Sequence, residues 1–325
     1  MLKIFTHIAD IIVYGWFGMH KGEHLSSSIH FFIEDTTKIF ALLTVMIYVI
    51  ALMRASMNVE RVRTYLSGKH RGIGYVLASL FGVVTPFCSC SSIPLFLGFT
   101  QARIPVGITM AFLITSPMIN EVAVLLLGSM LGLKFMIVYV VLGIVAGVVG
   151  GAFFDLIKAE KYLLEFVKKA QAQGPVQPLE TERPKRMSLK ERHVFAKEEL
   201  QEILGRVWKW VVIGVGAGAL LHGYVPEDFI SIHFSGAAWW NVPAIVMIGI
   251  PLYSSIHGVI PIAESLINKG LPIGSAVAFM MSMSAASFPE FMMLKQVMRT
   301  KMLVIFFVML LILFTICGWV LNIVF

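Results

Sequence analysis

The chain has 325 residues, of which 58% are apolar and 14% are charged, and its mean hydropathy is +0.83. A soluble domain carries about a quarter charged residues, so the composition excludes a soluble globular protein and predicts an all-α, multi-pass membrane protein. The formal net charge of +7 does not indicate nucleic-acid binding, because the basic residues fall in loops between apolar segments, where they signal topology.

The cysteine content and the N-terminus exclude two further classes. Three cysteines are too few for a disulfide framework. Two of them, Cys88 and Cys90, lie inside an apolar segment, and the third, Cys317, is predicted to be a small core residue of the last one. The N-terminus lacks the short apolar core and small-residue cleavage site of a removable signal peptide.

Apolar segments recur along the whole chain, at 2–19, 31–53, 72–99, 105–131, 133–157, 204–224, 242–267, 272–294 and 302–325. Residues 1–30 form an N-terminal apolar or interfacial segment, and the sequence leaves open whether 2–19 spans the membrane. We assign residues 31–157 to a first membrane repeat and 204–325 to a second. The polar stretch 158–203, rich in Lys, Arg and Glu, is predicted to be a cytoplasmic linker, partly helical and partly disordered.

The two halves of the chain repeat each other in sequence. A shift of 167 positions superposes Gly82 on Gly249, Ile93 on Ile260, Pro94 on Pro261, Pro105 on Pro272, Gly107 on Gly274, Ala111 on Ala278 and Phe112 on Phe279. A shift of 168 aligns Glu34 with Glu202 and Lys38 with Arg206. Matching Gly and Pro positions in two halves are typical of transporters built from structural repeats.

The loop charges predict that these repeats are inverted. Loop 54–71 and linker 158–203 are both basic and both predicted to be cytoplasmic, yet three apolar segments lie between them. The same conflict recurs in the second half. Both conflicts vanish if 72–99 and 242–267 are re-entrant hairpins, which leaves three crossings in each half and opposite topologies. The alternative is that every segment crosses the membrane and the basic residues mislead.

A run of hydroxyls and thiols between Pro86 and Pro94 is the most distinctive stretch of the chain. Its members, predicted to bind substrate at a break in the helix, are Cys88, Ser89, Cys90, Ser91 and Ser92. Proline removes a helical hydrogen bond, and broken backbone at membrane depth is tolerated where it is buried in protein or lines a cavity. The alternative is a kinked helix whose small residues pack closely against neighbours.

When the two halves are aligned by the shift of 167, the thiol-containing stretch of the first half falls opposite a histidine in the second. Cys90 aligns with His257, and Cys88 aligns with Ser255. In an extended segment, residues two apart point the same way, so Cys88 and Cys90 are candidates to hold one soft centre together with His257. The alternative is that His257 is a buried histidine with a structural hydrogen bond, although an ionisable residue inside the membrane is a functional candidate by default.

A second pair of predicted breaks follows the two hairpins. Their substrate-binding candidates are Ser116 and Asn120 in the first half and Ser284 and Ser287 in the second, while Ser255 is a substrate-binding candidate at the tip of the second hairpin. Each break also carries a glutamate in apolar surroundings, Glu121 or Glu290, and these are the proton-coupling candidates, because buried carboxylates can carry protons. For Glu290, an ion pair with Lys295 is the alternative.

Several stretches resemble the bacterial ArsP-type (YraQ-like) permease family. They are Phe31-Phe32-Ile33-Glu34-Asp35-Thr36-Thr37-Lys38, Thr85-Pro86-Phe87-Cys88-Ser89-Cys90-Ser91-Ser92-Ile93-Pro94-Leu95 and Ser116-Pro117-Met118-Ile119-Asn120-Glu121. The resemblance covers nearly the whole chain, and some members of that family export trivalent organoarsenicals. It implies a multi-pass permease of the bacterial inner membrane whose cysteines suit a trivalent metalloid.

The sequence therefore predicts a secondary transporter that exports a thiophilic small solute and is driven by protons. The chain has no phosphate-binding Gly-rich loop with lysine, so no ATPase of its own is predicted. One alternative is a permease for another small solute with structural cysteines. Another is an intramembrane thiol redox enzyme, which needs an electron-accepting partner. We expect no enzymatic activity and no cofactor, and the sequence leaves open whether the chain forms a homo-oligomer.

Overall fold

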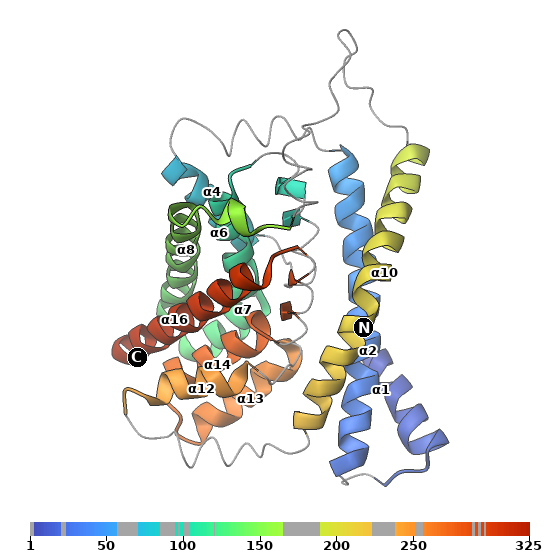
Figure 1. The fold of residues 1–325 in the computed structure, drawn as a ribbon. Coiled ribbons are helices and arrows are strands. Elements are labelled where there is room, and N and C mark those ends of the chain that lie inside the picture. The colour runs from blue at the N-terminus through green and yellow to red at the C-terminus, as the bar shows by residue number, and fades with distance from the viewer. Residues whose placement is uncertain are drawn as a thin grey trace. The chain divides into compact units, whose positions relative to one another are not determined.

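The computed structural model is helical throughout the part of the chain that it describes (Figure 1). The described residues are 3–20, 24–56, 71–84, 95–96, 98–100, 104–119, 121–164, 189–222, 238–250, 256–287, 290–291, 294–295 and 297–325. Within them, extended pairing is limited to an isolated antiparallel bridge between Leu163 and Met298. This agrees with the all-α class predicted from the composition.

Two helices are long and apolar enough to cross a bilayer, among the residues described. They are α8 (Leu133–Leu156) and α16 (Thr300–Val324), of 24 and 25 residues. A bilayer core about 30 Å thick needs about 20 helical residues at 1.5 Å each. Shorter apolar helices accompany them, namely α4 (Arg71–Val84), α6 (Val106–Met118) and α14 (Ile273–Ala285).

The two longest helices exceed the apolar segments from which they were predicted. Helix α2 (His24–Ser56) has 33 residues and α10 (Leu189–His222) has 34. The apolar segments were 31–53 and 204–224, because hydropathy marks the part of a helix that meets lipid and not the whole helix. Helix α10 therefore begins inside the segment predicted as a linker.

The chain divides into two compact units, each of which draws on both halves of the sequence. One unit comprises Met1–Leu42, Val207–Met292 and Leu310–Phe325, and the other comprises Leu43–Arg206 and Met293–Met309. Helices α2, α10 and α16 each contribute residues to both units.

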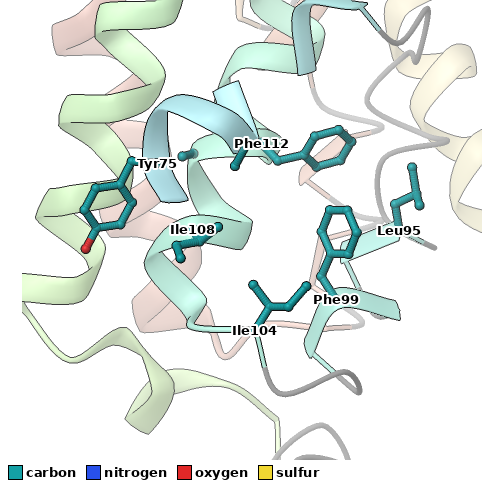
Figure 2. Packing of buried hydrophobic residues seen from close by; sticks show 8 residues of the cluster. Tyr75, Leu95, Phe99, Ile104, Ile108 and Phe112 are labelled. Carbon is teal, nitrogen blue, oxygen red and sulfur yellow. The ribbon is translucent and has the colours of Figure 1, made fainter. Parts of the chain in front are cut away.

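In the unit that contains residues 43–206, the helices α4, α6 and α8 pack against one another, and α7 (Glu121–Leu131) packs on α8. Every residue of α6 is buried. Figure 2 shows part of its core, where Phe112 of α6 and Phe99 lie close together, and their ring centroids are 5.4 Å apart. A helix buried on all sides has no solvent-facing polar side, which explains why the residues of α6 are apolar around most of the helix.

Glycines allow α6 and α8 to approach closely. A Cβ at Gly107 would lie 2.6 Å from the Gly151 carbonyl oxygen, and a Cβ at Gly147 would overlap the Thr115 hydroxyl. Small residues at contacts between helices are typical of membrane proteins, because in lipid the association of helices depends on close packing.

The end of α8 is tied to the start of α16 through backbone hydrogen bonds. Leu164 N donates to Val297 O at 3.2 Å, and Arg299 N donates to Tyr162 O at 3.0 Å. These bonds satisfy backbone groups just beyond two apolar helices and hold the two helix ends beside each other.

The other unit contains α1 (Lys3–Asp10), the π-helical segment η1 (Ile11–Trp16), the first part of α2, and the helices α12 (Asn241–Gly249), α13 (Ile256–Asn268) and α14. Helix α14 packs on both α12 and α13. The last turns of α16 also belong here, and a Cβ at Gly274 of α14 would overlap the Gly318 carbonyl oxygen.

Candidate functional site

Most of the residues predicted to bind soft solutes lie outside the described part of the chain. This holds for Cys88, Ser89, Cys90, Ser91 and Ser92, and also for Asn120 and Ser255. His257 lies in the first turn of α13, where the backbone is described and the side chain is not. Helix α4 ends at Val84, shortly before the thiol-containing stretch. The grouping of these side chains stays a prediction.

The predicted break around Ser116 and Pro117 coincides with the end of α6. That helix ends at Met118, with Pro117 in its last turn, and α7 begins at Glu121. Ile119 adopts an extended conformation, and its N–H donates to Thr115 O at 3.0 Å. Proline lacks the N–H that would bond to the preceding turn, so it weakens the helix at this point. The helix ends one residue later, at Met118. Ser116 is buried, 3% exposed.

Helix α8 supplies a hydrogen bond to the backbone that this break leaves open. The Tyr139 hydroxyl is buried and donates to Met118 O at 2.8 Å. The side chain of Ile119 packs against Gly143, where an added Cβ would overlap it. The last carbonyls of a helix need partners outside the helix, and here a neighbouring helix provides one. The break is therefore supported on one side by α8.

The second predicted break coincides with the end of α14. The helix ends at Ala285, and Ala286 N donates to Ser282 O at 3.1 Å. Ser284 is partly buried, and its hydroxyl donates to the carbonyls of Met280 and Met281 at 3.0 and 3.2 Å. Serine hydroxyls that bond to the preceding turn bend helices and keep the hydroxyl satisfied in apolar surroundings. Ser287, just past the helix, is 1% exposed.

The two proton-coupling candidates each follow one of these breaks, although they are 169 positions apart and therefore do not align in the register of 167. Glu121 is the first residue of α7, although its side chain is not among those described. Glu290 is 1% exposed, whereas Lys295 is exposed to solvent. A carboxyl buried to this degree inside a helical membrane protein is a functional candidate.

The start of α6 carries a polar cluster that the sequence analysis did not single out. Asp155, near the end of α8, accepts hydrogen bonds from Gly107 N at 3.2 Å and from the Tyr75 hydroxyl at 2.5 Å, and Arg71 lies 3.4 Å from it. A carboxylate at a helix N-terminus satisfies a free N–H and complements the helix dipole. In the sequence, Asp155 reads as a charge at the edge of an apolar segment, so only the packing reveals its role.

A similar contact occurs at the start of α14. Asn322 of α16 accepts a hydrogen bond from Ser275 N at 3.3 Å and donates one to the Ser275 hydroxyl at 3.2 Å. Position 322 lies 167 residues after Asp155. Both buried helices therefore begin against a polar side chain from the long apolar helix beside them.

Among the described residues, no group of three His, Cys, Asp or Glu side chains is placed to hold a metal ion. Cys317 is buried in α16, as predicted for a core residue. Candidate ligands for a soft solute are therefore those in and near the undescribed stretches, together with the buried hydroxyls at the two breaks.

Comparison with known proteins covers nearly the whole chain. A family model, ArsP_1, described as a predicted permease, matches residues 24–323. The chain is 20% identical over 312 residues to the UPF0718 protein MJ0584 of Methanocaldococcus jannaschii, covering 81% of this chain and 86% of that protein. It is 24% identical over 240 residues to the UPF0718 protein YraQ of Escherichia coli K12, covering 73% of this chain and 64% of that protein. No solved structure matches. Both breaks and the polar helix starts lie within the region matched by the family.

Proposed function

Because the chain belongs to the ArsP_1 family of predicted permeases, we propose that it is a secondary transporter of the bacterial inner membrane that exports a thiophilic small solute. The observation that carries this proposal is the family match over residues 24–323, which includes both broken segments. Broken helices that meet at membrane depth are typical of the binding sites of secondary transporters. A trivalent organoarsenical is the first candidate solute.

The proposed soft ligands are the thiolates of Cys88 and Cys90, with His257 as a third. Thiolate sulfur prefers soft, polarisable centres over hard cations. Trivalent arsenic bonds to sulfur, so a trivalent arsenical is the solute that we expect two nearby thiols to bind best. The hydroxyl of Ser116, and separately those of Ser284 and Ser287, are the further substrate-binding candidates in this proposal.

We further propose that the two halves are structural repeats, which is supported by the helix bounds. Helices α6 and α14 have 13 residues each, run from Val106 to Met118 and from Ile273 to Ala285, and each follows a proline with φ near −50°. Both ends are thus offset by 167 positions. Helices α8 and α16 begin at Leu133 and Thr300, which are also 167 positions apart.

The contacts between helices support the same register. Gly107 approaches Gly151 and Asp155, and Gly274 approaches Gly318 and Asn322, which are the residues 167 positions later. Gly82 and Gly249 likewise lie against equivalent hydroxyl residues, Thr115 and Ser282. A chance similarity of sequence would not preserve which residues touch.

The loop charges lead us to propose that the two repeats are inverted. An inverted pair allows the transporter to open alternately to either side by moving one repeat against the other. In this scheme the Cys88–Ser92 stretch enters from the cytoplasm and the Ser255–His257 stretch enters from outside. Glu121 and Glu290, one after each break, would carry protons inwards in exchange for the solute.

The proposed binding unit predicts that the two thiols are not independent. We would measure methylarsenite resistance and vesicle transport for Cys88→Ser, Cys90→Ser and the double variant. If both sulfurs hold one centre, each single variant loses nearly as much transport as the double variant. Additive losses, or full activity in all three, would indicate structural cysteines and a different solute.

A further inference from the structure

A network of ionisable side chains joins α1 to α2, outside both broken segments. His30, Glu34 and Lys38 lie one turn apart on α2, so they face the same side of the helix. Asp10, the last residue of α1, lies 3.0 Å from His30 Nε2. His30 Nδ1 lies 3.4 Å from Glu34 Oε2, and Lys38 Nζ donates to Glu34 Oε1 at 2.5 Å.

The network is largely shielded from water, and it is open at one end. The side chains of His30, Glu34 and Lys38 are 16 to 17% exposed, whereas Asp10 is 39% exposed. Asp35 is 5% exposed and lies 3.9 Å from Lys38 Nζ. Ionisable groups are costly in an apolar helix and persist where they have a function. Asp10 is the most exposed of the four side chains, so it is the one at which a proton would enter the network.

The following described residues belong to the elements near His30 and Glu34. From α1, Thr6 donates to Glu34 Oε1 at 2.7 Å, and His7 is exposed. From η1, the Tyr14 ring stacks on the His30 ring with centroids 5.6 Å apart. From α10, Gly216 lies against Phe32, and Lys209 is exposed beside the Trp208 ring. The π-helical form of η1 is itself uncommon, and such segments occur frequently at functional sites.

From this arrangement we propose that Asp10, His30, Glu34 and Lys38 form a proton relay that feeds the transport cycle. A proton from water binds Asp10 and passes to His30 Nε2, while the proton on His30 Nδ1 moves to Glu34 Oε2. His30 thereby exchanges one neutral tautomer for the other, and the net result is one proton moved from water to Glu34. Histidine suits this task because it has two ring nitrogens, so that one can accept a proton while the other releases one.

Lys38 converts the arrival of that proton into a change of contacts. While Glu34 is charged, Lys38 is held at 2.5 Å from it. A neutral Glu34 attracts the ammonium group much less than the charged form does, and among the described residues the other carboxylate within 4 Å of Lys38 Nζ is that of Asp35, at 3.9 Å. Protonation therefore transfers Lys38 from Glu34 to Asp35 on the same helix. Lys38 therefore has two alternative partners, and protonation of Glu34 determines which of them it contacts.

This relay rests on the proposed function only in its coupling to a solute, so its chemistry is tested without one. We would record pH-difference infrared spectra of the purified full-length protein in phosphatidylcholine vesicles, from alkaline to acidic buffer. The relay predicts a carboxylic-acid C=O band that is lost in Glu34→Gln and moved in frequency in Glu34→Asp. The Asp variant keeps the test usable if the Gln variant does not fold.

The midpoint of that band identifies the route of the proton. In His30→Gln the midpoint shifts by about one pH unit, because the imidazole that lies 3.4 Å from Glu34 Oε2 is replaced by an amide with a different hydrogen-bonding geometry. The matched control is Thr37→Val, which removes hydrogen bonds to the carbonyls of Ile33 and Glu34 without removing a titrating group, and its midpoint stays in place. Absence of any Glu34-dependent band, or an unmoved midpoint in His30→Gln, would mean that the network merely anchors α1 to α2.

A transport arm separates the relay from the proposed function. Methylarsenite exchange and methylarsenite accumulation under a pH gradient are compared for the wild type and Glu34→Gln. Loss of accumulation with retained exchange supports the relay as the coupling route. Equal accumulation in both, or loss of exchange as well, overturns it. If the wild type moves no methylarsenite, the proposed solute fails while the infrared result on Glu34 stands.

Discussion

Replacing Gly107 with alanine tests the close packing of α6 against α8. The added Cβ would lie 2.6 Å from the Gly151 carbonyl oxygen and 2.6 Å from Asp155 Cγ. Ordinary contact begins at 3.4 Å, so each contact is about 0.8 Å too short. The carbonyl belongs to a helix and cannot rotate away, so the two helices must separate or tilt. Forced overpacking of this kind costs about 1–3 kcal/mol.

The upper end of that range applies, because the substitution also displaces a polar contact. Asp155 must move from a position in which it accepts a hydrogen bond from Gly107 N at 3.2 Å. A loss of about 3 kcal/mol, at roughly 2 °C for each kcal/mol in a chain of this size, lowers the thermal midpoint by about 6 °C. The midpoint is measured in detergent from the monodisperse fraction that survives heating.

The matched control is Gly72→Ala in α4, where a Cβ meets nothing within 4 Å. Alanine is a better helix former than glycine by about 1 kcal/mol, so this variant keeps or slightly raises the midpoint. A wild-type midpoint in Gly107→Ala, with Gly72→Ala unchanged, would show that α6 and α8 do not approach as closely as described and would refute the packing argument.

Three further predictions follow from the helix ends and the topology. Single cysteines placed at Ser67 and Ser235 should be labelled from opposite faces of the membrane, and labelling of both from one face would contradict inverted repeats. Glu121→Gln should retain solute exchange and lose accumulation against a gradient, and full activity across a pH gradient would make Glu121 structural. Asp155→Ala should lower the thermal midpoint more than Asp155→Asn, because asparagine keeps an oxygen acceptor for the Gly107 N–H. Leaving that N–H without an acceptor costs about 1–3 kcal/mol. Equal midpoints in the two variants would exclude the capping role.

The ends of α6 and α14 were predictable from the sequence because their causes are local, whereas the break predicted between Pro86 and Pro94 lies outside the described residues. Proline at position 117 and the hydroxyls around positions 116 and 284 interrupt an apolar run, and both helices end where these residues occur. Among the described residues, hydropathy located the long apolar helices α8 and α16, but it did not locate the ends of α2 and α10. Helix α10 extends to Leu189 because helix propensity continues through polar residues that hydropathy assigns to a loop.

The ionisable network and the capping carboxylate were not predictable, because their causes are tertiary. The spacing of His30, Glu34 and Lys38 is readable as one helical face, but nothing in the sequence places Asp10 beside it. Likewise, Asp155 caps a helix whose first residues lie 48 positions earlier in the chain. Such contacts depend on how the helices pack. Glycines allow two helices to approach closely, but the sequence does not show which helix lies opposite a given glycine.

The most direct test of the account is transport by the purified protein in liposomes. We would load vesicles with buffer and impose a pH gradient across the membrane. We would then follow methylarsenite accumulation on the acidic side, with Cys88→Ser/Cys90→Ser as the control. The account predicts accumulation against the concentration gradient that disappears with a protonophore and is absent from the double variant. Accumulation that ignores the pH gradient, or equal transport without the two thiols, would contradict a proton-driven exporter of thiophilic solutes.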